Sequence, residues 1–295
     1  MKWQADSKIL LQGVHHPLSQ VYIQRMQAVG TQLVAGVSAG HRGETLLGIP
    51  VFDLVEEAVN TQGPADASLI LNPPYRVLDA CLEAMAAGIR QLVIVSEGVP
   101  PLDMIQLLHH SRETNTFVLG SGSQGLMLPG QLLVGTFMPH CYQPGTISLV
   151  SHSDALTDEV AYHLTQAGWG QSWVVSLGTD ALIGSNFEQW LQVLEEDEQT
   201  QAIVLVGQPT GQEELRAAHY IASAIEKPVI AYLAGCRTQT EKQVGDSLST
   251  IAWQLSHPSP GVAETLQAFA EAQIPLSYRP WELPSVLEML LNPGP

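Results

Sequence analysis

The chain has 295 residues, and its 12 lysines and arginines are set against 29 aspartates and glutamates, which gives a net charge of −17. A nucleic-acid backbone or an anionic membrane surface needs many basic contacts, so we expect neither nucleic-acid nor membrane binding. No apolar stretch approaches the ~20 residues of a membrane span, and the first residues do not resemble a signal peptide. The 3 widely spaced cysteines predict neither a disulfide framework nor a CxxC metal site, so a cytoplasmic protein is expected.

Short aliphatic segments alternate with helical patterns through the first half of the chain. The expected strands are Lys8–Val14, Gln32–Val37, Ser68–Leu71, Gln91–Val95 and Thr116–Leu119. The expected helices lie near Ser19–Val29, Leu54–Val59, Tyr75–Ala87 and Leu102–Ser111. Strands that are apolar throughout suit a parallel sheet covered on both faces, so this half is predicted to be a doubly wound α/β domain.

The amino-acid composition changes between Gly120 and Gly145, where Gly, Ser and Pro become frequent. This predicts a loop-rich connection between two domains. We expect one domain over residues 1–144 and a second over residues 145–295. In the second, the expected strands are Thr146–Val150, Trp173–Leu177, Ala202–Val206, Val229–Leu233 and Ile274–Ser277. The expected helices are Asp154–Ala167, Asn186–Glu195, Gln212–Ile225, Gly261–Ala272 and Leu283–Leu291. The same alternation predicts a second doubly wound α/β domain.

The loop after the first strand, Gly13–Ser19, is a candidate ligand site, because ligands of doubly wound folds bind beyond the carboxyl ends of the strands. It lacks the glycines of a GxGxxG turn, and Pro17 removes a backbone donor, so a dehydrogenase is not favoured. His15 and His16 are either metal ligands or solvent-exposed loop histidines. No Cys or His partner stands at a suitable spacing, so we prefer the second interpretation and expect no metal site.

Further loops follow the other strands at the same predicted edge. Arg42, in Ser38–Gly43, is either a forked phosphate contact or an ordinary surface arginine. Pro73, in Asn72–Tyr75, belongs to a rigid apolar lip that suits a flat ring. These loops are the expected ligand-binding edge of the first domain.

Several segments together resemble the α subunit of succinyl-CoA synthetase. They are Gly30–Pro50, Ser96–Met104 (SEGVPPLDM), Leu156–Glu159, Gly184–Phe187 (GSNF) and Thr200–Val206. The resemblance implies a CoA-binding Rossmann domain followed by a flavodoxin-like ligase domain, working with an ATP-grasp β partner. It also implies a second-domain histidine that relays phosphate as a covalent nucleophile.

The implied CoA site departs from the family pattern in part. The family's CoA-loop motif falls on four residues that do not match it: His15, His16, Pro17 and Leu18. The family's CoA-contacting lysine falls on His41, with Arg42 beside it as a substitute. A third CoA segment is kept, and it falls on Val95, Ser96 and Glu97. CoA is therefore implied by the fold and this segment, at a weakened site.

The implied catalytic positions depart further. The phosphohistidine position falls on Asp246, its supporting acid on Gln208, and the substrate-loop tyrosine on Asp158. Gln208 lacks the charge that would stabilise an imidazolium. Asp154 and Asp158 add negative charge where a carboxylate or phosphate substrate needs the opposite, and like charges at ~4 Å repel by about 1 kcal/mol even in water.

Three residues in the second half leave an alternative open. Asp246 is either an aspartyl-phosphate site or the N-cap of the following turn, and we prefer the cap. His257 either replaces the lost histidine or lies in a proline-flanked surface loop, which we prefer. Cys236 is either a thiol activated by its neighbour Arg237 or a small buried side chain, which we prefer.

Three functions follow from these departures. The preferred hypothesis is a non-catalytic or regulatory α-like chain that keeps CoA or nucleotide binding and pairs with an ATP-grasp β subunit or another copy of itself. The second is an active acid–thiol ligase or transferase using a non-histidine route with an ATP-grasp partner. The third is a module that has lost CoA and keeps only a partner-binding surface.

Overall fold

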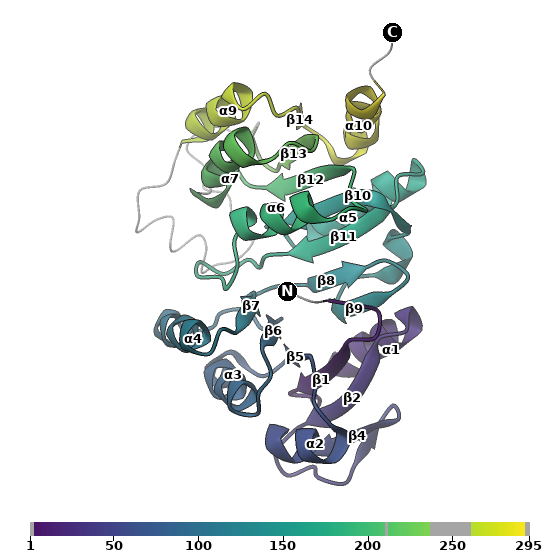
Figure 1. The fold of residues 1–295 in the computed structure, drawn as a ribbon, viewed down its shortest axis with the longest axis vertical. Helices are drawn as coiled ribbons and strands as arrows, with labels where there is room; N and C mark the ends of the chain where they lie inside the picture. The colour runs from purple at the N-terminus through teal and green to yellow at the C-terminus, as the bar shows by residue number, and fades with distance from the viewer. Residues whose placement is uncertain (1–2, 210–211, 237–260, 293–295) are drawn as a thin grey trace. The chain divides into compact units, whose positions relative to one another are not determined.

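A computed structural model describes residues 3–209, 212–236 and 261–292 of the chain. The residues divide into two compact units: Met1–Pro139 with Asp180–Ser185, and His140–Thr179 with Asn186–Pro295. Each unit holds a largely parallel sheet with helices, which confirms the predicted α/β class (Figure 1). In the described part of the chain, no helix combines the length and apolar character required to cross a membrane.

The first unit is built on a sheet with the strand order β3-β4-β2-β1-β5-β6-β7. These strands are β1 (Lys8–Gln12), β2 (Gln32–Val37), β3 (Thr45–Leu46), β4 (Ile49–Phe52), β5 (Ala67–Ile70), β6 (Gln91–Ile94) and β7 (Phe117–Leu119). All neighbours are parallel except β3 and β4, which form an antiparallel pair. The strand order reverses beside β1, so the loops after β1 and β2 lie at the edge where doubly wound folds bind ligands.

The strands of the first unit are buried on both faces. In β1, Leu10 belongs to a core cluster with residues of β5, β6 and three helices, while Ile9 and Leu11, which point the other way, are also fully buried. The helices of that cluster are α2 (Val55–Gln62), α3 (Val77–Ala86) and α4 (Pro101–Glu113). Helix α1 (Ser19–Val29) covers the other side of the sheet (Figure 1). The uninterrupted apolar strands are thus explained by helices on both faces.

The stretch from Gly120 to Gly145 differs from the prediction of a loop-rich crossing. It contains β8 (Gly125–Leu128) and β9 (Leu132–Gly135), which pair as an antiparallel hairpin. A Cβ at Gly125 or Gly135 would collide with the facing backbone, so these glycines permit the close approach of the two strands. The glycines that suggested a loop are therefore packing positions in a hairpin.

In the second unit, five parallel strands lie in the order β14-β13-β12-β10-β11. They are β10 (Pro144–Ser151), β11 (Gln171–Ser176), β12 (Ala202–Gly207), β13 (Val229–Leu233) and β14 (Leu276–Ser277). The helices are α5 (Ala155–Gln166), α6 (Phe187–Glu196), α7 (Gln212–Ala224), α9 (Val262–Glu271) and α10 (Leu283–Leu291). Figure 1 shows α6, α7 and α9 side by side, away from α10. The loop after the central strand β10 contains the segment that the sequence resemblance predicts to be a substrate loop.

Candidate functional site

The loop after β1 leaves the sheet at Gly13, which has φ +76°. A Cβ there would lie 2.8 Å from the backbone nitrogen of Asn72, so this position needs glycine for both its conformation and its space. Within the loop, the Leu18 amide donates to His16 Nδ1 at 3.2 Å, and the Ser19 amide to the His16 carbonyl at 2.9 Å. Pro17 has no amide to offer, so several backbone donors of this loop are already committed or absent.

The loop after β2 is organised by one carboxylate. Asp53 Oδ1 accepts three successive backbone amides, from Gly40 at 2.7 Å, His41 at 3.1 Å and Arg42 at 3.2 Å. Because these backbone amides donate to Asp53, the loop has a fixed shape. The same amides are then not available to donate to a phosphate. The side chains of His41 and Arg42 therefore project from a backbone that Asp53 holds in place.

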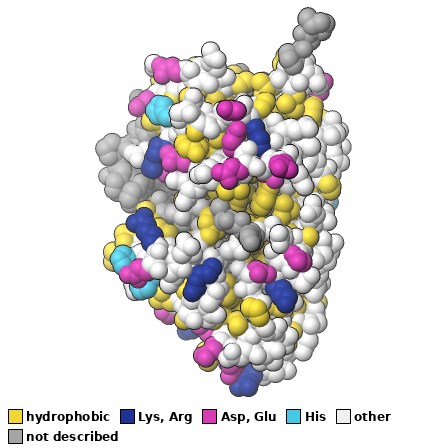
Figure 2. Space-filling view, in the orientation of Figure 1, with side chains coloured by type: hydrophobic (Ala, Val, Ile, Leu, Met, Phe, Trp, Pro, Cys, Tyr) yellow, Lys and Arg dark blue, Asp and Glu magenta, His cyan; other side chains and the backbone are white. Residues whose placement is uncertain are grey.

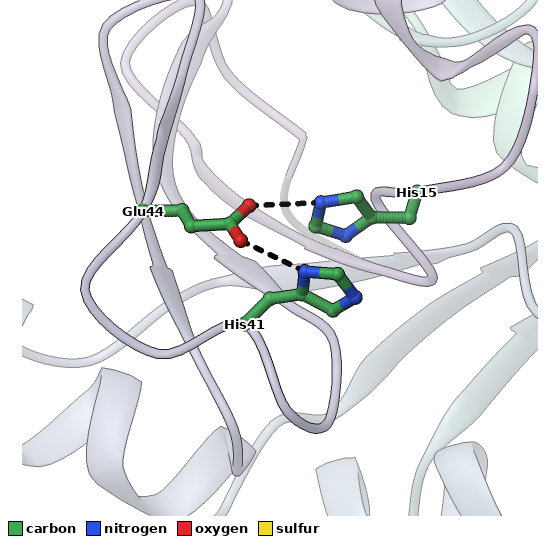
Figure 3. A group of neighbouring side chains, drawn as sticks. All are labelled: His15, His41 and Glu44. Atoms are coloured by element: carbon green, nitrogen blue, oxygen red, sulfur yellow. Dashed lines mark hydrogen bonds and ion pairs between the residues drawn. The ribbon is translucent and has the colours of Figure 1, made fainter.

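His15 and His41, from these two loops, meet at Glu44 (Figure 3). Their rings stack with centroids 3.7 Å apart, His15 Nε2 lies 3.1 Å from Glu44 Oε2, and His41 Nδ1 lies 2.9 Å from Glu44 Oε1. The hydrogen bond with His41 is the largest influence on the Glu44 carboxyl; it lowers the pKa of that group, His15 adds to the effect, and desolvation opposes it. His16, the other histidine of the predicted pair, instead stacks with Tyr22.

Arg42 has an acidic partner in the first unit. Its Nη1 lies 2.9 Å from Glu57 Oε1 in α2, and its side chain is 65% exposed. A phosphate would therefore have to compete with Glu57 for the guanidinium, or share it. Two other residues of the predicted CoA site are exposed: Leu18, at the end of the loop after β1, and Pro73, in the loop after β5.

The Val95, Ser96 and Glu97 segment follows β6 and is held from two sides. The Val95 amide donates to the Ile70 carbonyl at 3.1 Å, and Ser96 Oγ donates to the Asn72 carbonyl. Just beyond Glu97, which is exposed, the buried Asp180 carboxylate accepts the Gly98 amide at 2.9 Å. These contacts fix the backbone at the carboxyl ends of β5 and β6.

In the second unit, the loop after β10 places His152 against a buried acid. His152 Nδ1 lies 3.1 Å from Glu214 Oε1, and the backbone N–H of Gln208 donates to the same oxygen at 2.8 Å. Glu214 is fully buried, and among the described residues its other oxygen, Oε2, has no hydrogen-bond partner. The structure thus brings Gln208 close to the predicted substrate loop, with the His152–Glu214 pair between them.

Asp158, which the sequence resemblance assigns to the position of a substrate-loop tyrosine, lies in the first turn of α5 and is 5% exposed. Tyr142 Oη donates to Asp158 Oδ1 at 2.7 Å. Burial, followed by the neighbouring Asp158 charge, raises the pKa of Tyr142 well above its ordinary value. This hydrogen bond gives Asp158 a structural role inside the unit.

The remaining predicted residues lie at or beyond the end of β13, and three residues of the site were not predicted. Asp246 and His257 lie outside the described residues, whereas Cys236 is half-buried after β13. Sequence reasoning missed Glu44, Asp53 and Glu214. Only Glu44 carried a local signal, because it stands three residues after His41; the other two reach their partners from separate elements.

Comparison with known proteins identifies the family. A family model described as a CoA binding domain matches residues 4–98, and one described as a succinyl-CoA ligase-like flavodoxin domain matches residues 144–253. The ADP-forming succinate–CoA ligase subunit alpha 2 of Archaeoglobus fulgidus is 37% identical over 239 residues, covering 81% of this chain and 83% of its own. This chain belongs to the succinate–CoA ligase α-subunit family.

A second relative and a solved structure are also similar to this chain. The malate–CoA ligase subunit alpha of Methylorubrum extorquens is 32% identical over 248 residues, with 83% of each chain covered. The structure of ATP citrate lyase from Methanothrix soehngenii, in complex with citrate and coenzyme A, has a TM-score of 0.84 and 20% identity. It covers 100% of this chain, which spans only 52% of that longer chain, and it supports the fold alone. The chain is thus an α-type chain of the acid–CoA ligase family.

Proposed function

We propose that this α-type chain binds CoA but forms no phosphohistidine, and that it acts as a cytoplasmic, non-catalytic or regulatory partner of an ATP-grasp β-type subunit or of its own copies. The match of both family models supports the proposal, together with the sequence resemblance, which assigns Gln208 and Asp246 to the family's supporting-acid and phosphohistidine positions. An amide and a carboxylate cannot reproduce a carboxylate-supported imidazole nucleophile.

The first unit supplies a place that fits part of CoA. Helix α1 begins at Ser19, beyond the loop that contains His15; the Leu18 and Ser19 amides donate to His16, and the amides of Gln20 and Val21 precede the first intrahelical hydrogen bond, from Tyr22 to the Leu18 carbonyl. Such a helix start favours an anionic phosphate, and Ser96 and Val95 lie on a backbone that Asn72 and Ile70 hold. Glu44 and Glu57 bring negative charge to the same loops, so we expect CoA to bind more weakly than at a site with an unpaired lysine.

Calorimetry with CoA tests the binding step directly. We expect one CoA per chain, and we expect Arg42→Ala to weaken binding by about tenfold, the cost of one charge-assisted contact. Arg112→Ala, on α4, is the matched control and should leave the affinity unchanged. If CoA produces neither a heat of binding nor a shift in the melting temperature of the unmodified chain, then the chain does not bind CoA and is a partner-binding module.

Labelled ATP and a β-type subunit test the missing relay. We expect no stoichiometric label on the chain, and none on the double variant Asp246→His with Gln208→Glu, because the substrate loop carries His152 and Asp154 where the family has Arg and Gly. Stoichiometric labelling of the unmodified chain would overturn the non-catalytic role. Labelling of the double variant alone would show that the two substitutions are the whole of the loss.

One observation favours a second candidate, an active acid–CoA ligase chain, although through His152 and not through the non-histidine route expected from the sequence. His152 is held by the buried Glu214, and an imidazole oriented by a carboxylate is the arrangement of an activated base or nucleophile. Any label would then be assigned by its chemistry. An acid-labile label abolished by His152→Ala points to the imidazole, whereas a hydroxylamine-labile label abolished by Asp246→Asn points to an acyl phosphate.

A further inference from the structure

Three metal-ligand side chains converge where the first two loops of the Rossmann unit meet. His15, His41 and Glu44 each offer one ligand atom, and these atoms all lie within 4.8 Å of one another. They come from two loops: His15 from the loop after β1, and His41 and Glu44 from the loop between β2 and β3. This convergence is invisible in the spacing of the histidines along the sequence.

The backbone that carries each ligand is fixed before any ion binds. Asp53 clamps the amides of the His41 loop, and Gly13 seats the His15 loop against Asn72. Glu44 is held on the β3–β4 side, where its carbonyl accepts the Val51 amide at 2.9 Å. A site whose ligands are already positioned loses little entropy when the ion binds.

The ligand types select the class of ion. Imidazole nitrogen with carboxylate oxygen suits zinc and similar divalent transition metals, whereas calcium and magnesium prefer sites made of oxygen alone. Metal–ligand bonds of about 2.0–2.2 Å place neighbouring ligands of a tetrahedron roughly 3.3 Å apart. His15 Nε2 and His41 Nδ1 lie 3.1 Å and 2.9 Å from the two different oxygens of Glu44, and one ligand atom from each residue lies within 4.8 Å of the others, so side-chain rotations can bring the three atoms to that separation around an ion.

We propose that His15, His41 and Glu44 bind a divalent transition-metal ion of the zinc type, with a fourth position left to water or an anionic oxygen. The side chains of His15, His41 and Glu44 are 36%, 39% and 55% exposed, so an ion can enter from solvent. Three protein ligands with one open position is the arrangement of accessible zinc sites rather than of closed structural ones. The inference does not rest on the proposed function, because metal affinity is measured without CoA.

The test is titration of the full-length, chelator-treated chain with Zn²⁺ in competition with a chromophoric chelator, and with Co²⁺ followed by its visible absorption. We expect one tight equivalent and a Co²⁺ spectrum of a four-coordinate site. His15→Ala, His41→Ala and Glu44→Gln should each weaken Zn²⁺ binding by at least about tenfold, since even outer-shell partners of a metal contribute that much.

Two controls separate this site from general binding by histidines. His16→Ala removes the neighbouring imidazole, and the double variant His109→Ala with His110→Ala removes a pair on α4; both should bind Zn²⁺ like the unmodified chain. Thermal unfolding in chelator shows that each variant is folded. If the three ligand variants bind Zn²⁺ as tightly as the controls do, or if no tight equivalent is found, then the three residues form only a hydrogen-bonded cluster and the proposal is wrong.

Discussion

Asp180 is the residue that ties a distant segment of the chain to the first unit. Its buried carboxylate accepts the amides of Gly98 at 2.9 Å and Val99 at 3.3 Å, and the hydroxyl of Ser121 at 2.7 Å. Asp180→Ala would leave these donors without that acceptor. We expect a loss of about 3 kcal/mol in the free energy of unfolding, measured by urea denaturation. Asp6→Ala, at an exposed aspartate, is the control, and a loss below about 0.5 kcal/mol for Asp180→Ala would contradict the role.

Tyr142 couples the stability of the second unit to alkaline pH. Its hydroxyl is buried beside Asp158, which keeps the pKa well above the ordinary value of about 10. Above pH ~10, this tyrosine loses its hydroxyl proton in the unfolded chain but keeps it in the folded chain, so the free energy of unfolding falls as pH rises. Tyr142→Phe should cost about 1–3 kcal/mol at neutral pH and make the decline above pH ~10 shallower.

The matched control for Tyr142 is Tyr75→Phe, whose side chain is 82% exposed. It should change neither the neutral stability nor the alkaline slope. Tyr22 and Tyr232 also have a raised pKa because of burial, so the slope of Tyr142→Phe should shrink without disappearing. An unchanged slope would mean that the Tyr142 hydroxyl ionises equally easily in the folded and unfolded chain.

At the scale of elements, the end of β1 depends on a glycine for space as well as for conformation. Gly13 (φ +76°) and Gly30 (φ +99°, after α1) both have left-handed backbones, but only Gly13 faces the Asn72 backbone. In the part of the chain that the structure describes, no atom lies within 4 Å of a Cβ placed at Gly30. Gly30→Ala should therefore cost about 1 kcal/mol, the strain alone. Gly13→Ala should cost at least about 2 kcal/mol more, because it forces β1 and β5 apart.

Both glycine variants are compared by urea denaturation, and Gly13→Ala should also weaken Zn²⁺ binding because it moves the His15 loop. Gly30→Ala should leave Zn²⁺ binding unchanged. Equal losses of stability in the two variants would show that the close approach to Asn72 carries no energy.

The elements could be predicted from sequence wherever apolar periodicity was decisive. The ranges Ser19–Val29, Gln32–Val37, Val229–Leu233 and Leu283–Leu291 agree with the structure to the residue. β3 and β4 were not predicted, because Thr45–Leu46 and Ile49–Phe52 are too short to show a period. The hairpin of β8 and β9 was missed because its close-packed glycines have the composition of a loop.

The candidate site was predictable at its strand ends but not in its pairings. His15, His41, Arg42 and Ser96 follow strands, and parallel strands bring such positions to one edge. The pairing of Arg42 with Glu57 and of Glu44 with two imidazoles depends on where a helix and a hairpin pack, which single-sequence patterns do not determine. The interpretation of His15 and His16 as a sequence pair therefore overlooked the nearer partner, His41.

At the scale of the whole molecule, the net charge of −17 acts on stability through repulsion between surface carboxylates. On the face that Figure 2 shows, acidic and basic side chains lie scattered, with no continuous basic patch to offset the excess. Salt shortens the reach of this repulsion to about 10 Å at 0.1 M. The folded chain, which concentrates the charge, should gain more from screening than the unfolded one.

We therefore expect the thermal midpoint at pH 7 to rise as NaCl increases from low concentration to about 0.3 M, since a gain of about 1 kcal/mol corresponds to roughly 2–4 °C in a domain of this size. The control is the same series at pH 5, close to the sequence pI of about 4.8, where little net charge remains to be screened. A midpoint that rises equally at both pH values would assign the effect to salt acting on apolar burial. A midpoint that falls at pH 7 would show that attractive ion pairs, such as Arg42 with Glu57, outweigh the repulsion.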